Sequence, residues 1–66
     1  MRALTQRQTD VLRLLIKGLN SRQMAKHLAI SENTVKQHAH AVFSKLRVSS
    51  RAEAVAAAGR LGIKVA

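Results

Sequence analysis

One stretch of the chain, residues 31–46, carries side chains that could form hydrogen bonds in a fixed pattern on one side of a helix. At 3.6 residues per turn, the polar residues on that side are Asn33, Lys36, Gln37, His40 and Ser44. A helix that is only solvated usually shows Glu and Lys there, whereas this side offers amide, imidazole and hydroxyl groups with one certain positive charge. Base edges of DNA are read by groups of this kind. The stretch therefore predicts a DNA-recognition helix, whose chemistry is binding without any bond being made or broken.

The opposite side of the same stretch is apolar. Its residues follow one another at steps of four, three and four: Val35, Ala39, Val42 and Leu46. Such a stripe is typical of an amphipathic helix that packs on a core. Ser31 stands where an N-cap belongs, directly before this helix.

Capping signals divide the rest of the chain into helices. A hydroxyl or amide residue followed three positions later by Gln or Glu is typical of a helix start. Three such pairs occur: Thr5 with Gln8, Asn20 with Gln23, and Ser50 with Glu53. Gly18 and Gly62 suit positions just past a helix end. The sequence therefore predicts an all-α fold of four helices, over about 6–17, 21–28, 32–46 and 51–61.

The second and third predicted helices are separated by only three residues. A short helix, a tight turn and a longer helix form a helix-turn-helix. Ala25 is small where two such helices would cross. The turn often has glycine where this chain has Ala29, and a left-handed backbone at this alanine would cost roughly 1–2 kcal/mol.

Composition limits the class of protein. The 66 residues carry a net charge of +9, from 12 Lys and Arg against 3 Asp and Glu, which favours a polyanionic partner. Cysteine is absent, and three histidines with three scattered acids give no reason to expect a metal or a cofactor. No apolar run approaches the roughly 20 residues of a membrane span, and no signal-peptide pattern appears. We expect one cytoplasmic domain over 1–66, with residues 1–4 and 63–66 frayed.

Other classes of function are less well supported by the sequence. Phe43 is the only aromatic residue, which argues against a sheet that stacks RNA bases. A membrane-active module would need lysine-rich polar faces, which the stretch 31–46 lacks. An enzyme is not expected, because no nucleophile–base pair or carboxylate pair is visible. The alternative that stays open is a basic protein-interaction or oligomerisation module with only non-specific DNA affinity.

Four segments resemble one family in order and spacing: LTQRQTDVLRLLIKGL, ISENTVKQH, VFSKLRV and SSRAEAV. They resemble the LuxR/FixJ-type (GerE-like) DNA-binding domain of bacterial transcription regulators, from Leu4 to Leu61. The resemblance implies a four-helix domain whose third helix enters the major groove of double-stranded DNA. It also implies a homodimer through the fourth helix, two half-sites and, in many members, an upstream receiver or ligand-sensing domain. The chain would then be an output domain or a short stand-alone regulator, with RNA polymerase as a further expected partner.

The resemblance implies roles for single residues. Base contacts are implied at Lys36, Gln37 and His40, and the exposed side of the helix adds Asn33. Phosphate contacts are implied at Ser21, Arg22, Thr34 and His38. From the residues alone, Thr34 could instead bond its own backbone, and His38 could pack against the bundle. Three further basic residues flank the reading side: Lys26, Lys45 and Arg47. We expect one of them to contact phosphate, with Lys45 as the candidate.

Two departures from the family pattern concern Gln8 and Gln23, where the family often has Glu. Such a Glu can pair with an arginine at the position of Arg51. Without that partner, Arg51 is expected to be free to contact phosphate.

The fourth predicted helix is rich in alanine. Alanine favours helices and fills cores, and a smooth surface would also let two helices approach closely. We expect Val55 and Leu61, with neighbouring alanines, to cover the open side of the bundle. The residues expected at a dimer interface are Ala54, Ala57, Ala58 and Leu61.

Overall fold

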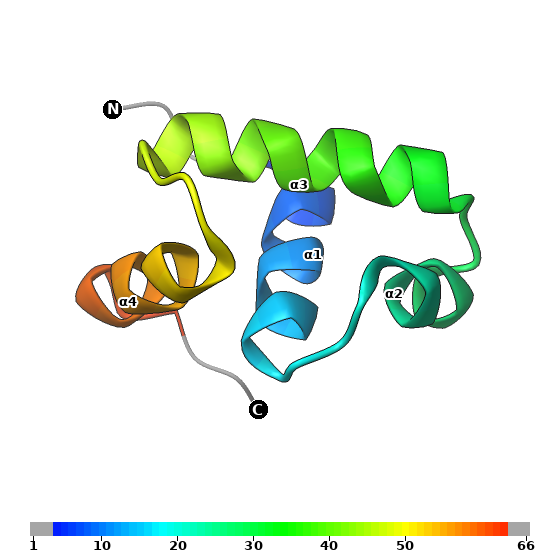
Figure 1. Cartoon of the computed structure of the whole chain (residues 1–66), viewed down its shortest axis with the longest axis horizontal. Coiled ribbons are helices and arrows are strands. Elements are labelled where there is room, and N and C mark those ends of the chain that lie inside the picture. Colours follow the sequence, from blue (N-terminus) through cyan, green and yellow to red (C-terminus); the bar gives the residue numbers. More distant parts are fainter. Residues whose placement is uncertain (1–3, 64–66) are drawn as a thin grey trace.

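The computed structural model describes residues 4–63, which form four helices joined by short loops. The helices are α1 (Gln6–Ile16), α2 (Ser21–Leu28), α3 (Glu32–Leu46) and α4 (Arg51–Leu61). In Figure 1, α3 runs along the top, α1 descends below it at the centre, and α4 and α2 lie on either side of α1. The described residues contain no strand, so the predicted all-α fold is confirmed.

The predicted fraying of both chain ends is only partly covered by the structure. Residues 1–3 and 64–66 lie outside the described residues. Leu4 and Ile63, which were also expected to fray, are half-buried and pack against the core.

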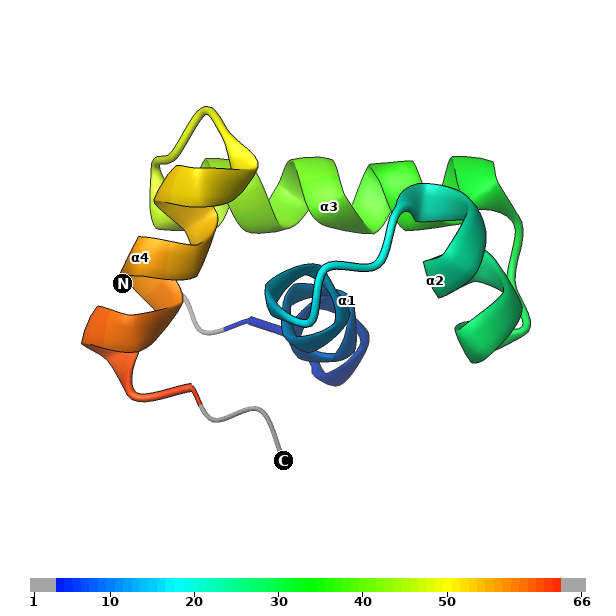
Figure 2. The ribbon, with the colours of Figure 1, turned by 60° about the horizontal axis from the view of Figure 1, so that its bottom comes forward.

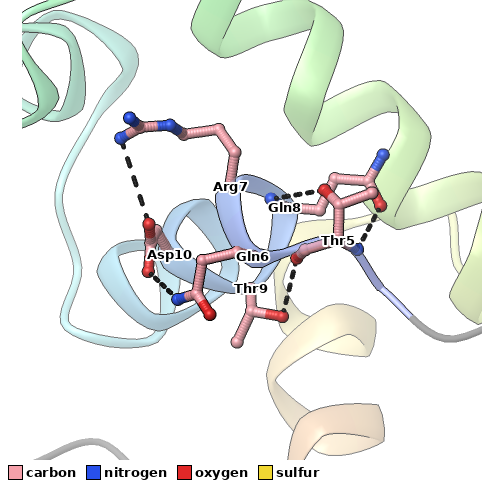
Figure 3. Close-up of polar contacts among 6 residues, drawn as sticks. All are labelled: Thr5, Gln6, Arg7, Gln8, Thr9 and Asp10. Atoms are coloured by element: carbon pink, nitrogen blue, oxygen red, sulfur yellow. Dashed lines mark hydrogen bonds and ion pairs between the residues drawn. The ribbon is translucent and has the colours of Figure 1, made fainter.

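Side-chain caps begin the helices as the sequence predicts. In α1, Oγ1 of Thr5 accepts a hydrogen bond from the backbone N–H of Gln8, and Oε1 of Gln8 accepts one from the N–H of Thr5, both at 3.1 Å (Figure 3). Asn20 and Gln23 form the same reciprocal pair at the start of α2, both bonds at 2.9 Å. At the start of α3, Oγ of Ser31 accepts a hydrogen bond from the N–H of Thr34, without the reciprocal bond of a capping box. Each cap satisfies backbone donors that the first turn of a helix leaves unpaired.

The capping box predicted for α4 forms only in half. Oγ of Ser50 accepts from the N–H of Glu53 at 3.2 Å, as expected. The Glu53 carboxylate, however, accepts from the N–H of Ser49 at 2.9 Å, one residue before the cap. Ser50 has a more extended φ of −145°, which turns the chain so that the preceding residue lies within reach of the carboxylate.

All four helices end in the same way. The residue just past the last turn has a left-handed backbone: Gly18 (φ 94°), Ala29 (57°), Arg47 (57°) and Gly62 (73°). The following residue donates its N–H to the carbonyl five positions back, at 3.0–3.1 Å. This is the Schellman arrangement. The donors are all branched aliphatic residues that pack against the core: Leu19, Ile30, Val48 and Ile63. α1 ends at Ile16, one residue before the predicted end, with Lys17 as its cap.

The core has two parts. One lies between α1, α2 and α3, and its buried members are Val11, Leu14, Leu15, Met24, Ala25 and Val35. The other lies between α1, α3 and α4, and its principal buried members are Leu12, Val42, Ala54 and Ala58. Phe43 packs against both parts. α1 is therefore central, and both parts of the core contact the inward side of α3.

The inward side of α4 is formed by alanines, as expected, but without Val55, which was also expected there. Ala54, Ala57 and Ala58 are only 0%, 4% and 1% exposed, whereas Val55 and Leu61 are 38% and 46% exposed. Alanine on the inward side lets α4 lie close to α1 and α3, where larger side chains would hold it away. The prediction of a dimer interface at the three alanines was therefore wrong, since they belong to the core of the chain itself. Of the four residues predicted there, only Leu61 lies on the surface.

Membrane spans and metal clusters are both absent from the described residues. No helix among them is long and apolar enough to cross a membrane. Residues 4–63 also contain no group of three side chains that could hold a metal ion.

Candidate nucleic-acid interface

The outward side of α3 carries the polar residues singled out in the sequence. Val35 and Val42 are fully buried, which fixes the rotation of the helix and turns its other side to solvent. We call the exposed residues on that side the polar strip: Asn33, Lys36, Gln37, His40 and Ser44. At 1.5 Å per residue the strip is about 16 Å long. In Figure 1, α3 forms one edge of the molecule, with no other helix beyond it.

Two of the residues implied as phosphate contacts lie at the margin of the polar strip. Thr34 is half-buried, and its Oγ1 lies 2.9 Å from Oγ of Ser31, which also accepts the N–H of Thr34 at 3.1 Å. Thr34 thus takes part in the local bonding that the sequence left open, at the N-terminus of α3. His38 is also half-buried, one position beyond the exposed Gln37.

The start of α2 supplies the other two implied phosphate contacts. Ser21 is half-buried and Arg22 is exposed, directly after the cap at Asn20. Lys26 is exposed one turn after Arg22, on the same side of the helix. A helix N-terminus presents backbone N–H groups and a partial positive charge, which together attract phosphate.

Lys45 is held within the chain. Its Nζ donates a 2.8 Å hydrogen bond to Oε1 of Gln8, the same oxygen that accepts the N–H of Thr5. This bond joins the last turn of α3 to the first turn of α1. Lys45 therefore already has a partner within the chain, and its contact with phosphate remains a prediction. No pattern in the sequence indicates this contact, because 37 positions separate the two residues.

Arg51 also has a partner inside the chain. Its guanidinium donates to the backbone carbonyl of Leu19, in the loop between α1 and α2. The expectation that Arg51 is free was therefore wrong. With Gln where the family often has Glu, a backbone carbonyl accepts the hydrogen bond that a carboxylate could have taken.

The three acidic residues leave the polar strip without a negative charge. The Asp10 carboxylate accepts from Nε2 of Gln6 at 3.0 Å and lies 3.9 Å from Nη1 of Arg7 (Figure 3). Glu53 is bonded to Ser49. Glu32 alone lies on α3, in the first turn, where the helix dipole favours it. Nothing on the strip from Asn33 onward therefore repels a phosphate backbone.

The sequence of this chain matches a known family. The profile of the GerE family, described as bacterial regulatory proteins of the luxR family, matches residues 2–58. The chain belongs to the luxR family. Its members are DNA-binding transcription regulators, so the predicted family and the helix-turn-helix fold are both confirmed.

Relatives within the luxR family are moderately similar in sequence. The chain is 42% identical over 59 residues to a glycerol metabolism activator of Pseudomonas putida, covering 89% of this chain and 27% of that protein. It is 42% identical over 62 residues to the transcriptional regulatory protein LnrK of Bacillus subtilis, covering 94% and 28%. It is 49% identical over 51 residues to the nitrate/nitrite response regulator NarP of Escherichia coli, covering 77% and 24%. The chain thus spans about a quarter of the length of these relatives.

A solved structure agrees with the fold. The response regulator ChrA of a heme-sensing two-component system superposes with a TM-score of 0.90 at 41% sequence identity, over 97% of this chain and 32% of that one. The luxR-type domain is therefore the same four-helix unit in both proteins.

Proposed function

We propose that this luxR-family domain binds double-stranded DNA in a sequence-specific manner, with α3 in the major groove. The observation that carries the proposal is the polar strip, which is exposed, free of acidic residues and rich in amide, imidazole and ammonium groups. The major groove is about 12 Å wide and admits one α-helix. The domain acts by binding, and no catalytic step is assigned to it.

Two sets of residues divide the work on DNA. Base edges are contacted by Asn33, Lys36, Gln37 and His40. Phosphates are contacted by Ser21, Arg22, Thr34 and His38, which position α3 on the duplex. Phosphate contacts supply affinity and orientation, whereas base contacts supply specificity. Lys45 and Arg51 are secondary candidates for phosphate, because each already has a hydrogen bond within the chain.

Pairing of two copies on DNA is the second part of the proposal. The outward side of α4 carries the exposed Val55 beside the small exposed Ala52 and Ala56, and Leu61 is exposed at the end of the helix. A pair related by two-fold symmetry would place two α3 helices on half-sites about one helical turn apart. We further propose a cytoplasmic location, and control by a receiver or ligand-sensing domain with RNA polymerase as the downstream partner. The description of NarP and ChrA as response regulators supports the part that concerns a receiver domain.

A selection from a random duplex pool tests the proposal. The chain is mixed with the pool at two salt concentrations, and the bound duplexes are sequenced. We expect a repeated half-site to be enriched and the affinity to fall steeply with salt, because phosphate contacts release counterions. Steep salt dependence without any enriched sequence would instead support the alternative, a basic interaction module with non-specific DNA affinity.

A further inference from the structure

A hollow lies between α1 and α2, apart from the polar strip. Its volume is about 180 Å³, and it is lined by Asp10, Arg13, Leu14, Lys17, His27 and Leu28. Small-molecule sites usually measure about 300–1,000 Å³. This α1–α2 hollow is therefore too small for a typical cofactor, and its size suits one large side chain of another protein.

The α1–α2 hollow faces away from the proposed DNA side. Gln8 marks the side of α1 that contacts α3, through Lys45. Asp10, Arg13 and Lys17 recur at helical spacing on the other side of α1. In Figure 2, α3 lies above α1, and α2 begins level with α3 and descends below it, so that its C-terminal end lies lower than α3. The hollow therefore stays accessible while α3 lies on DNA.

The chemistry of the hollow combines an apolar floor with a basic rim. Leu14 is buried at 6% exposure, and Leu28 is half-buried beside it. Arg13, Lys17 and His27 are exposed around them. The only acid at the rim, Asp10, already accepts from Gln6 and lies beside Arg7. The net character of the rim is therefore positive.

We propose that the α1–α2 hollow docks an acidic amphipathic helix of a partner protein. One large apolar side chain of that helix covers Leu14 and Leu28, and its flanking carboxylates meet Arg13 and Lys17. A second copy of this chain does not fit, because it carries 12 basic residues against 3 acidic ones. A DNA backbone has the charge for the rim but no apolar group for the floor.

Titrations with two labelled peptides test the proposal. One peptide is a short amphipathic helix with leucine on one face and glutamate elsewhere, and the other has lysine in place of each glutamate. We follow the backbone amides of the chain by NMR. The glutamate peptide is expected to shift amides around Arg13, Lys17 and Leu28 in a saturable way, and to leave those around Lys36 and Gln37 unshifted. The lysine peptide is expected to shift neither set.

A matched pair of variants separates docking from general charge. Lys17→Glu is expected to weaken binding of the glutamate peptide about tenfold, since it reverses one rim charge. Arg60→Glu changes the net charge by the same amount at an exposed position on α4, away from the hollow, and is expected to leave peptide binding nearly unchanged. Both variants change the net charge equally, so both should lower DNA affinity by the same amount. A variant that has lost the fold would also lose DNA binding, which distinguishes it from a variant that has lost only peptide docking.

Three outcomes would overturn the proposal. The glutamate peptide could shift the polar strip instead, which would show simple attraction to basic residues. Both variants could weaken the peptide equally. Duplex DNA alone could shift the residues of the hollow, which would make this surface part of the nucleic-acid interface.

Discussion

Ala29 and Arg47 hold a left-handed backbone with φ of 57° that glycine adopts without strain. Both stand at helix ends where the carbonyls of the last turn need the N–H groups that follow. The packing of Ile30 and Val48 against the core holds these ends in place. The strain of the left-handed backbone at these two residues is therefore offset by the packing of the aliphatic side chains that follow them.

Replacement of Ala29 by glycine should stabilise the domain. The left-handed conformation costs alanine about 1 kcal/mol or more, which glycine avoids. For a domain of this size, 1 kcal/mol corresponds to a rise in Tm of about 4–8 °C. Ala56→Gly, at an exposed position inside α4, is the control and should lower stability by about 1 kcal/mol. A lower Tm for Ala29→Gly in thermal denaturation would contradict this account of the turn.

Gln37 and Arg22 should differ in how they affect DNA binding. Gln37→Ala should cost about 1–3 kcal/mol on the selected site and relax the preference at one base pair, with little change in salt dependence. Arg22→Ala should weaken binding to all sequences alike and reduce the salt slope by about one. Affinities for the selected site and for single-base variants, each at several salt concentrations, give both quantities. Equal effects of the two variants on every sequence would remove Gln37 from the base-reading set.

At the scale of helices, two polar contacts tie the region of α1 to α3 and to α4. Oε1 of Gln8 receives Lys45 from α3, and the Leu19 carbonyl after α1 receives Arg51 from α4. Both contacts join residues more than thirty positions apart. The bond from Lys45 to Gln8 adds to the packing that holds α3 over α1, and so to the direction in which the polar strip points.

Gln8 and Gln23 form a natural comparison for measuring the tie between α1 and α3. Each is the third residue of its helix and forms a reciprocal cap, but only Gln8 also accepts a hydrogen bond from Lys45. Gln8→Ala should therefore destabilise the domain by about 1 kcal/mol more than Gln23→Ala. Urea denaturation of both variants provides the numbers. In the background Lys45→Met the difference should vanish, and its persistence would show that the hydrogen bond contributes nothing.

The two sides of α4 should respond differently to a larger side chain. Ala57→Leu adds volume to a closely packed contact and should cost about 1–3 kcal/mol. Ala56→Leu adds the same volume on the exposed side and should change stability by less than about 0.5 kcal/mol. The free energy of unfolding of the two variants decides the matter. Equal costs would mean that α4 is rotated from the position described.

The sequence predicts those features of the structure that depend on residues close together in the chain. Helix starts, helix ends and the outward residues of α3 follow from spacing and capping within a few residues, and the structure agrees with them. The inward side of α4 was not predictable in this way, because six of its eleven residues are alanine or glycine and periodicity needs a contrast between large and small. The partners of Lys45 and Arg51 were missed because they depend on which helices become neighbours. The direct contacts with DNA remain predictions.

For the molecule as a whole, the charge is spread widely, while the apolar surface is concentrated on α4. The two large apolar residues exposed in the described part of the chain are Val55 and Leu61. We therefore expect a second copy to pair through the outward side of α4, around Val55, away from the polar strip.

Introduction of a charge on α4 should uncouple two half-sites. Val55→Asp should leave the affinity for a duplex with one half-site nearly unchanged, apart from a small loss due to net charge. On a duplex with two half-sites it should remove most of the cooperativity, because a buried unpaired carboxylate opposes pairing. Gel-shift titrations with both duplexes measure the two effects, and the single half-site is the internal control. Unchanged cooperativity would place the pairing surface elsewhere.

The shared ending of the four helices has a consequence for the speed of folding. Each ending is built from residues within six positions of one another, so it can form before any distant contact exists. Once formed, the endings of α1, α2 and α3 each direct one branched side chain toward the core on which the next helix also packs. Helical chains with mainly local contacts fold in microseconds to milliseconds. We expect this chain to fold at the fast end of that range, with Ala29→Gly raising the folding rate wherever the turn between α2 and α3 forms early.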